Sequence, residues 1–264
     1  MNLERIVADL VEKVERRYFG KYRGTVVDNQ DPSKLGRLKL QVPSVLGSDV
    51  VTGWAMPCTP YGGDADVGFL YIPAVGSGVW AEFEEGDLEF PIWCGTFWSA
   101  PNGDSELPKP NKGSDGTEES DIQDPPTSKI IKTAKGHTLQ FEDADGSEMV
   151  LLVEGSQGHF LTMDQNGITM TDANGNTMQF TSDGATVTDA NGNKVEMTSD
   201  GTTVTDANGN KIEMTSSGIQ ISDVPGNQIE MSSSGFTLTA TAAFTIDAGG
   251  AVTIKGSAID FQQA

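Results

Sequence analysis

Histidine and cysteine are scarce in this sequence, with two of each among 264 residues. A structural zinc site needs about four such ligands, and His137 and His159 lie far along the chain from Cys58 and Cys94. We therefore expect no metal site and no cofactor. The two cysteines are interpreted as small, buried, apolar side chains in a reducing compartment.

The shortage of histidine also argues against catalysis. Both histidines follow a glycine at the predicted start of a strand, where turn and surface residues are common. Many serines and aspartates are present, but nothing in their spacing selects one as a nucleophile or as an orienting carboxylate. We expect no catalytic residues and no enzyme activity.

Long hydrophobic runs and basic residues are lacking too. No apolar run approaches the ~20 residues of a membrane-spanning helix, and the N-terminus has neither the basic start nor the apolar core of a secretory signal peptide. Lysine and arginine number 17 against 38 acidic residues, a formal net charge of −21. The missing signal peptide predicts a protein that is made in the cytoplasm. Because its negative charge repels phosphate backbones, we expect it not to bind nucleic acid.

The first feature present is an amphipathic helix predicted at residues 1–19. Its apolar side chains recur at spacings of three and one, which places them on one helical face. They are Leu3, Ile6, Val7, Leu10, Val11 and Val14. A helix of about four turns is marginal alone in water, so this stripe needs a partner. Packing on its own domain and docking on a neighbouring subunit are both open.

Residues 20–100 predict a small β-barrel, and residues 101–128 predict a linker. Short alternating segments separated by turn signals are typical of a closed barrel or sandwich. They lie at 22–27, 37–42, 53–58, 68–72, 79–83 and 92–97. The following stretch is rich in Pro, Gly, Ser and acidic residues. It is too short to hold a catalytic domain.

Residues 129–264 contain a tandem repeat. Gly175, Gly192, Gly209 and Gly226 stand 17 residues apart, as do the glycines that begin the second strand of each unit. Each unit reads Asp-Ala-Asn-Gly-Asn, a short strand, Thr-Ser-Asp-Gly and a second short strand. Repeats of this kind indicate a β-solenoid or an array of strands. Calcium bound along the acidic turns is a minor alternative.

The repeat strands each have one apolar face, with apolar residues two positions apart. Two inward side chains per strand enclose little in one chain, so we predict three chains wound about one axis, with each strand edge paired by the next chain. The predicted trimer core consists of Leu161, Met163, Met178, Phe180, Val195, Met197, Ile212, Met214, Ile219, Ile221, Ile229 and Met231.

Several motifs, in order along the chain, resemble the phage baseplate protein V and VgrG-type spike family. The barrel motifs are GRLKLQVP at 36–43, TGWA at 52–55, PYGG at 60–63, GFLYIP at 68–73, VGSGVWAEF at 75–83, EGD at 85–87 and FPIWCGT at 90–96. KGHTL at 135–139 and FED at 141–143 resemble the start of the family's β-helix.

The resemblance implies an all-β homotrimer, an OB-fold barrel followed by a three-stranded intertwined β-helix. Such a spike sits at the centre of a baseplate beneath the hub and is driven through the target cell envelope. The protein would then belong to a bacteriophage tail or to an injection particle assembled in the cytoplasm. A trimeric tail fibre or adhesin that binds a surface receptor is the alternative.

Two departures from the family matter. The linker leaves no room for the lysozyme domain that some relatives carry. The last 100 residues contain no histidine, so the iron-binding His-x-His tip of other relatives is missing. The chain ends with Ile259 and Phe261 near its terminus, which predicts a blunt apolar end that binds a separate PAAR-like tip protein.

Overall fold

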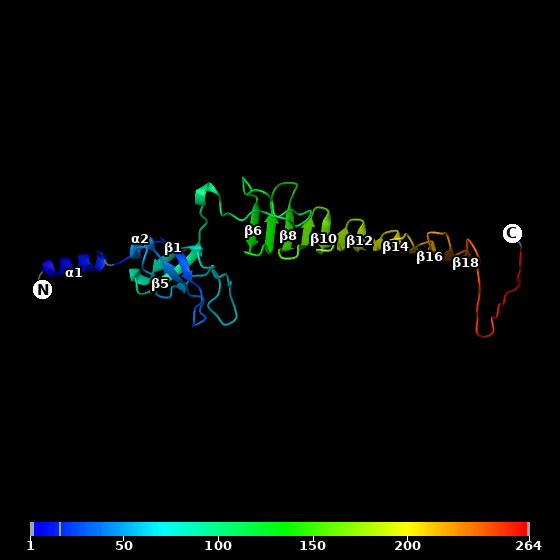
Figure 1. The fold of residues 1–264 in the computed structure, drawn as a ribbon, viewed down its shortest axis with the longest axis horizontal. Coiled ribbons are helices and arrows are strands. Elements are labelled where there is room, and N and C mark those ends of the chain that lie inside the picture. Colours follow the sequence, from blue (N-terminus) through cyan, green and yellow to red (C-terminus); the bar gives the residue numbers. More distant parts are fainter. Residues whose placement is uncertain (1–2, 16, 263–264) are drawn as a thin grey trace. The chain divides into compact units, whose positions relative to one another are not determined.

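The computed structural model describes residues 3–15 and 17–262, which fall into two compact units, Met1–Leu107 and Pro108–Ala264. Strands form 39% of the chain and helices 7% (Figure 1), so the predicted all-β class is confirmed. The division lies inside the segment predicted as a linker, 101–128. Among the residues described, no helix has the length and apolar character needed to cross a membrane.

The first unit is a five-stranded barrel preceded by a helix. Its strands follow the order β2-β1-β4-β5-β3, with only β3 and β5 parallel. The elements are α1 (Leu3–Glu15), β1 (Tyr22–Asp28), β2 (Lys39–Gln41), α2 (Pro43–Leu46), β3 (Met56–Pro57), β4 (Gly78–Phe83), the 3-10 turn η1 (Glu84–Gly86), β5 (Pro91–Thr96) and the 3-10 turn η2 (Pro101–Gly103).

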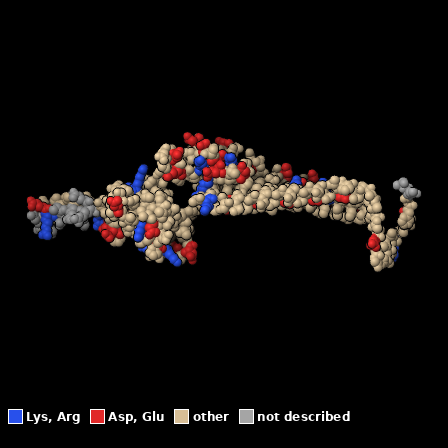
Figure 2. Space-filling model, in the orientation of Figure 1, with Lys and Arg blue, Asp and Glu red and all other residues tan. Residues whose placement is uncertain are grey.

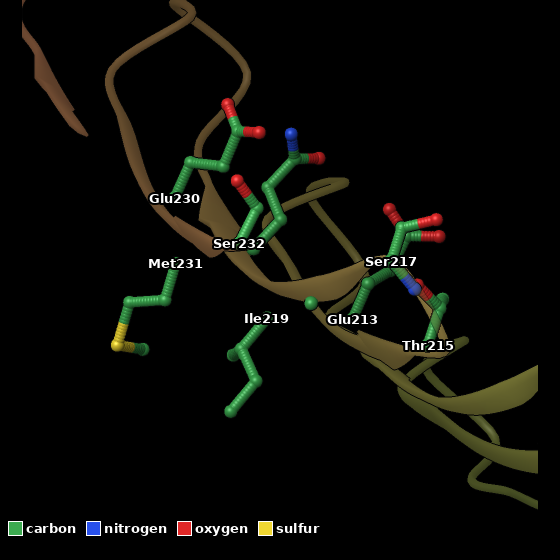
Figure 3. A pocket seen from close by; sticks show the side chains of 9 residues that line it. Glu213, Thr215, Ser217, Ile219, Glu230, Met231 and Ser232 are labelled. Carbon is green, nitrogen blue, oxygen red and sulfur yellow. The ribbon is translucent and has the colours of Figure 1, made fainter. Parts of the chain in front are cut away.

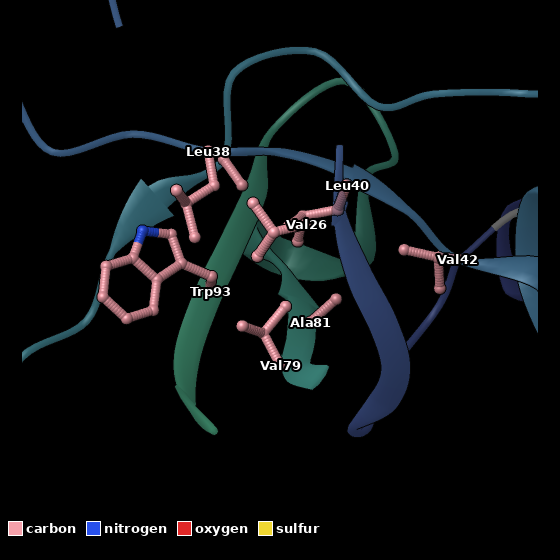
Figure 4. Close-up of a cluster of buried hydrophobic side chains, with 8 residues drawn as sticks. Val26, Leu38, Leu40, Val42, Val79, Ala81 and Trp93 are labelled. Atoms are coloured by element: carbon pink, nitrogen blue, oxygen red, sulfur yellow. The ribbon is translucent and has the colours of Figure 1, made fainter. Parts of the chain in front are cut away.

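The barrel core forms because alternate side chains of each strand point inward. In β4, Val79, Ala81 and Phe83 are buried while the residues between them are not. Val79 and Ala81 pack in one buried cluster with Leu38, which precedes β2, and with Trp93 of β5 (Figure 4). The indole Nε1 of Trp93 donates to the Gly36 carbonyl at 3.1 Å, so its polar edge is also satisfied.

The strand predicted at 68–72 is wrong, because this segment lies in the loop between β3 and β4. Phe69, Leu70 and Tyr71 are all exposed. Four consecutive apolar residues have no polar alternation and therefore do not define one inward face. The other five predicted barrel segments each contain a strand.

The second unit is a thirteen-stranded antiparallel sheet in which each strand pairs with its neighbours in sequence. Its strands are β6 (Ser128–Lys132), β7 (Thr138–Glu142), β8 (Met149–Glu154), β9 (His159–Asp164), β10 (Gly167–Thr171), β11 (Thr177–Thr181), β12 (Gly184–Thr188), β13 (Lys194–Thr198), β14 (Gly201–Thr205), β15 (Lys211–Thr215), β16 (Gly218–Ser222), β17 (Gln228–Ser232) and β18 (Gly235–Thr239).

This topology corrects the expectation that strand edges pair with the next chain. From β6 to β18, the ladder hydrogen bonds run between consecutive strands of one chain. The tight turns are the cause, since a turn of a few residues brings the next strand back beside the previous one. Gly201 shows how little room these turns leave. It has φ +145°, and an added Cβ would collide with the Met214 carbonyl oxygen.

The start of the second unit folds onto the sheet. Asn111 pairs with Glu118 in an isolated antiparallel bridge. We call residues 108–120 the cover segment, because it hydrogen-bonds to the first strands. The Gln140 side chain accepts from Asn111 N at 2.7 Å, and Thr162 Oγ1 donates to the Gly113 carbonyl at 2.9 Å. Residues 108–120 therefore belong to the sheet's unit.

Candidate assembly surfaces

The long sheet has one apolar and one polar face, and cross-strand pairing keeps them separate. Met214 lies opposite Ile219, whereas Glu213 lies opposite Gln220. Figure 3 shows Ile219 and Met231 on one side of the ribbon and Glu230 on the other. Because side chains alternate along every strand, this register makes the apolar face continuous along the sheet.

A single chain does not bury the apolar face. The twelve predicted core residues lie on it, and ten of them are exposed, with 36% to 48% of their area accessible. These ten are Met163, Met178, Phe180, Val195, Met197, Ile212, Met214, Ile219, Ile221 and Met231. Leu161 and Ile229 are half-buried. The stretch from β10 to β18 is mostly uncharged in the view of Figure 2, and charged side chains gather over the β6 to β8 end.

The opposite face is already covered at the β6 to β9 end. There the cover segment lies over Gln140 and Thr162, and Leu151 beside them is fully buried. On the apolar side, Leu152 of the same strand remains exposed. The chain thus closes the Gln140 face of these strands by itself and leaves the apolar face open.

Sequence reasoning missed the cover segment. Its composition is polar, and polar segments are usually interpreted as linkers. The contact depends on Asn111, which is buried and donates its side-chain amide to the Gly116 carbonyl at 2.8 Å. Thr138 Oγ1 in turn donates to Asn111 Oδ1 at 3.2 Å. A buried amide of this kind leaves no pattern of hydrophobicity that would reveal it.

Four aspartates organise the turns along one edge of the sheet: Asp172, Asp189, Asp206 and Asp223. In the first, Asp172 Oδ1 accepts from the backbone N–H groups of Asn174 and Asn176, and Oδ2 accepts from Asn176 Nδ2 at 2.7 Å. These bonds, led by the Asn176 amide, lower the pKa of Asp172 to about 2. The pKa values of the other three are lowered by the matching asparagines.

Successive turns are also tied to one another. Asn176 Oδ1 accepts from Ala190 N at 3.0 Å, and Asn193 Oδ1 accepts from Ala207 N at 2.9 Å. The histidines take the same place in the earlier turns, where His137 Nδ1 accepts from Gly155 N and His159 Nδ1 accepts from Ala173 N. Both histidines thus hold backbone at turns, as the sequence predicts.

The helix α1 carries a second exposed apolar surface. All six residues of its stripe are exposed, from 40% for Ile6 to 73% for Leu3. The chain after the helix is anchored to the barrel, since Tyr18 N donates to the Gly86 carbonyl at 2.8 Å and Arg17 pairs with Asp87 at 3.2 Å. Because the six side chains of the stripe are exposed, the single chain does not bury them against its own barrel.

The end of the second unit differs from the sheet. Residues 240–262 form no strand, and Ile259 and Phe261 are exposed. Within the described part of the chain, no three His, Cys, Asp or Glu side chains are grouped closely enough to hold a metal ion.

The interpretation of the cysteines as buried is wrong, because Cys58 is exposed and Cys94 is half-buried.

Comparison with known protein families identifies the barrel segment. Residues 22–98 match the family model described as the type VI secretion system/phage-baseplate injector OB domain. No curated protein matches the chain. The matched segment holds β1 to β5, and the resemblance drawn from its motifs is confirmed. Residues 22–98 are therefore similar to the OB domain of phage-baseplate and type VI secretion injectors.

Proposed function

We propose that this protein is the central spike of a contractile tail or injection-system baseplate, active as a homotrimer and not as an enzyme. The observation that carries the proposal is the apolar face of the long sheet, which stays open in a chain that also carries an injector OB domain. Three copies would turn these faces toward one axis and remove them from water, at a gain of about 25 cal/mol per Å².

The choice of a closed trimer follows from the two faces of the sheet. At the β6 to β9 end the Gln140 face is occupied by the cover segment, which leaves the apolar face of these strands to meet other copies. A single apolar face of this extent on a monomer would be prone to aggregation. A closed ring of three copies protects all of it, and the acidic residues keep the outer surface soluble.

The function would be mechanical. The needle is proposed to cross the target cell envelope under axial load when the sheath contracts. In such a rod every strand from β7 to β17 is held by ladder bonds on both sides, and many bonds must break together for the rod to fail. The site of action would be the baseplate of a bacteriophage tail or of an injection particle assembled in the cytoplasm.

The two ends are proposed to bind different partners. The α1 stripe would dock on the baseplate hub, because its six apolar residues are exposed in the single chain. Ile259 and Phe261 would form the platform for a PAAR-like tip protein. A tail fibre or adhesin, the alternative function, would bind target cells through its own end without such a tip.

The test is the oligomeric state of the purified full chain, measured by light scattering after gel filtration. Met178→Asp would bury three unpaired charges near the axis, each costing about 3 kcal/mol or more, and we expect it to abolish the trimer. Gln179→Asp is the matched control, since Gln179 lies next along β11 between Thr169 and Thr186 on the polar face.

Gln179→Asp is expected to remain trimeric. A monomeric wild-type chain would overturn the proposal, and so would a soluble, stable trimer of Met178→Asp.

A further inference from the structure

The two cysteines lie on adjacent strands of the OB barrel. The parallel strands β3 and β5 place Met56 opposite Ile92 and Pro57 opposite Trp93. The next hydrogen bond in the same register runs from Cys58 N to the Trp93 carbonyl at 2.9 Å. Cys58 therefore stands directly across from Cys94, on strands about 4.8 Å apart.

Both thiols are on the outside of the barrel. Trp93 points into the core, with 4% of its area exposed, so its neighbour Cys94 points outward. Residues directly opposite in a parallel pair share a face, and Cys58 is itself exposed. A strand separation of about 4.8 Å lies within the Cα window of about 4.4–6.8 Å that a disulfide requires.

The two thiols differ in their surroundings. Lys21 Nζ lies 3.1 Å from Cys94 Sγ and 2.6 Å from Glu82 Oε1. Burial raises the pKa of the Cys94 thiol in spite of this ammonium group. Cys58 is in contact with solvent and is therefore the thiol that an external reagent meets first.

We propose that Cys58 and Cys94 are a redox-active pair that forms an intramolecular disulfide when the protein meets an oxidising medium. The oxidant is a small-molecule or protein disulfide. The Cys58 thiolate attacks one of its sulfur atoms, forms a mixed disulfide and releases a thiolate. The Cys94 thiolate then attacks the Cys58 sulfur and releases the second thiolate. Two cysteine thiols are oxidised, one external disulfide is reduced, and both protons pass to the released thiolates.

The disulfide would stabilise β3, the shortest strand of the barrel. β3 has only two residues and lies at the end of the strand order, and Cys58 is where the chain leaves it for the loop to β4. A covalent link from this point to β5 restricts the unfolded chain and stabilises the barrel. The pair would stay reduced in the cytoplasm and close outside it.

Intact-protein mass spectrometry of the full chain, incubated with oxidised glutathione and then with an alkylating reagent, tests the pair. The wild type is expected to lose the mass of two hydrogen atoms and to take up neither glutathione nor alkyl groups. Cys94→Ser is expected to stop at a glutathione adduct on Cys58. Adducts or alkylation at both wild-type cysteines would overturn the proposal, as would disulfide-linked chains on a non-reducing gel.

Thermal unfolding supplies a second readout that does not depend on the mass. Oxidation is expected to raise the midpoint of the wild type by several degrees, and a reductant is expected to reverse the rise. Cys58→Ser and Cys94→Ser are the matched controls and should show no such rise. A midpoint that oxidation leaves unchanged or lowers in the wild type would contradict the stabilising link.

Discussion

At the scale of single residues, the turns of the long sheet depend on carboxylate–amide pairs. Each aspartate accepts three or more hydrogen bonds inside its own turn, and the asparagine that it holds accepts a backbone N–H from the next turn. One side chain therefore contributes to two turns. Local bonds of this kind keep the backbone from choosing another turn type.

The lowered pKa values of these aspartates predict how stability depends on pH. A group with a lower pKa in the folded state stabilises the fold above its unfolded pKa, about 3.9 for Asp, and this contribution disappears as the pH falls through the folded value. For Asp172 that window runs from about pH 4 to about pH 2. The unfolding midpoint of the wild type is expected to drop across it.

Asp189→Asn tests whether the turn aspartates cause the loss of stability in acid. It should lower the midpoint at neutral pH and flatten the decline in acid, because the carboxylate that holds Asn193 is gone. Asp200→Asn removes the same charge from a turn in which the aspartate donates its backbone N–H to Thr198 Oγ1. A decline equally steep in Asp189→Asn and the wild type would contradict the assignment.

At the scale of elements, the period-two pattern predicted the repeat strands and the side chains that form their apolar face, but not which strands pair with each other. Alternation assigns Met178 and Gln179 to opposite faces, and the structure agrees. It says nothing about which strand lies beside β11. The short glycine turns contain that information, because a tight turn places each strand antiparallel beside the one before it. The prediction instead paired each strand edge with the next chain, because a strand edge that stays open is prone to aggregation.

The glycines that begin the second strand of each unit give an element-scale prediction. Gly201→Ala is expected to cost more than the ~1–3 kcal/mol of an unfavourable φ, since the new methyl group would collide with the Met214 carbonyl oxygen. Gly235 has φ +139° and open space around it. Gly235→Ala is therefore the matched control and should lower the unfolding midpoint less. Equal losses in the two variants would show that the close approach carries no cost.

At the scale of the whole molecule, the OB domain and the location of the apolar face could be predicted, whereas the exact boundary between the two units, within the predicted linker 101–128, could not. The barrel motifs occur in a fixed order that few other folds share. The boundary at Leu107 and Pro108 depends on the buried amide of Asn111, whose contacts arise only after folding. Long-range polar contacts of this sort follow no periodicity in sequence.

The two proposed ends of the molecule give a prediction at the same scale. Removing residues 1–19 should abolish co-purification with the hub, and removing residues 240–264 should abolish binding of the tip protein. Both truncated chains are expected to remain trimeric, because β6 to β18 stay complete in each. Each truncation is the control for the other. If only the C-terminal truncation lost hub binding, the proposed assignment of the hub to the N-terminal end and of the tip protein to the C-terminal end would be wrong.

The strictly sequential pairing of β6 to β18 has a consequence for size. Each 17-residue unit adds two strands, or about 10 Å along the sheet. Each unit is followed by a turn of the same kind, the Asp-x-x-Gly-Asn turn with which the next unit begins. Insertion or deletion of a whole unit would leave every local contact pattern intact. The number of units therefore sets the length of the sheet, which can change in steps of one unit without redesign of the barrel.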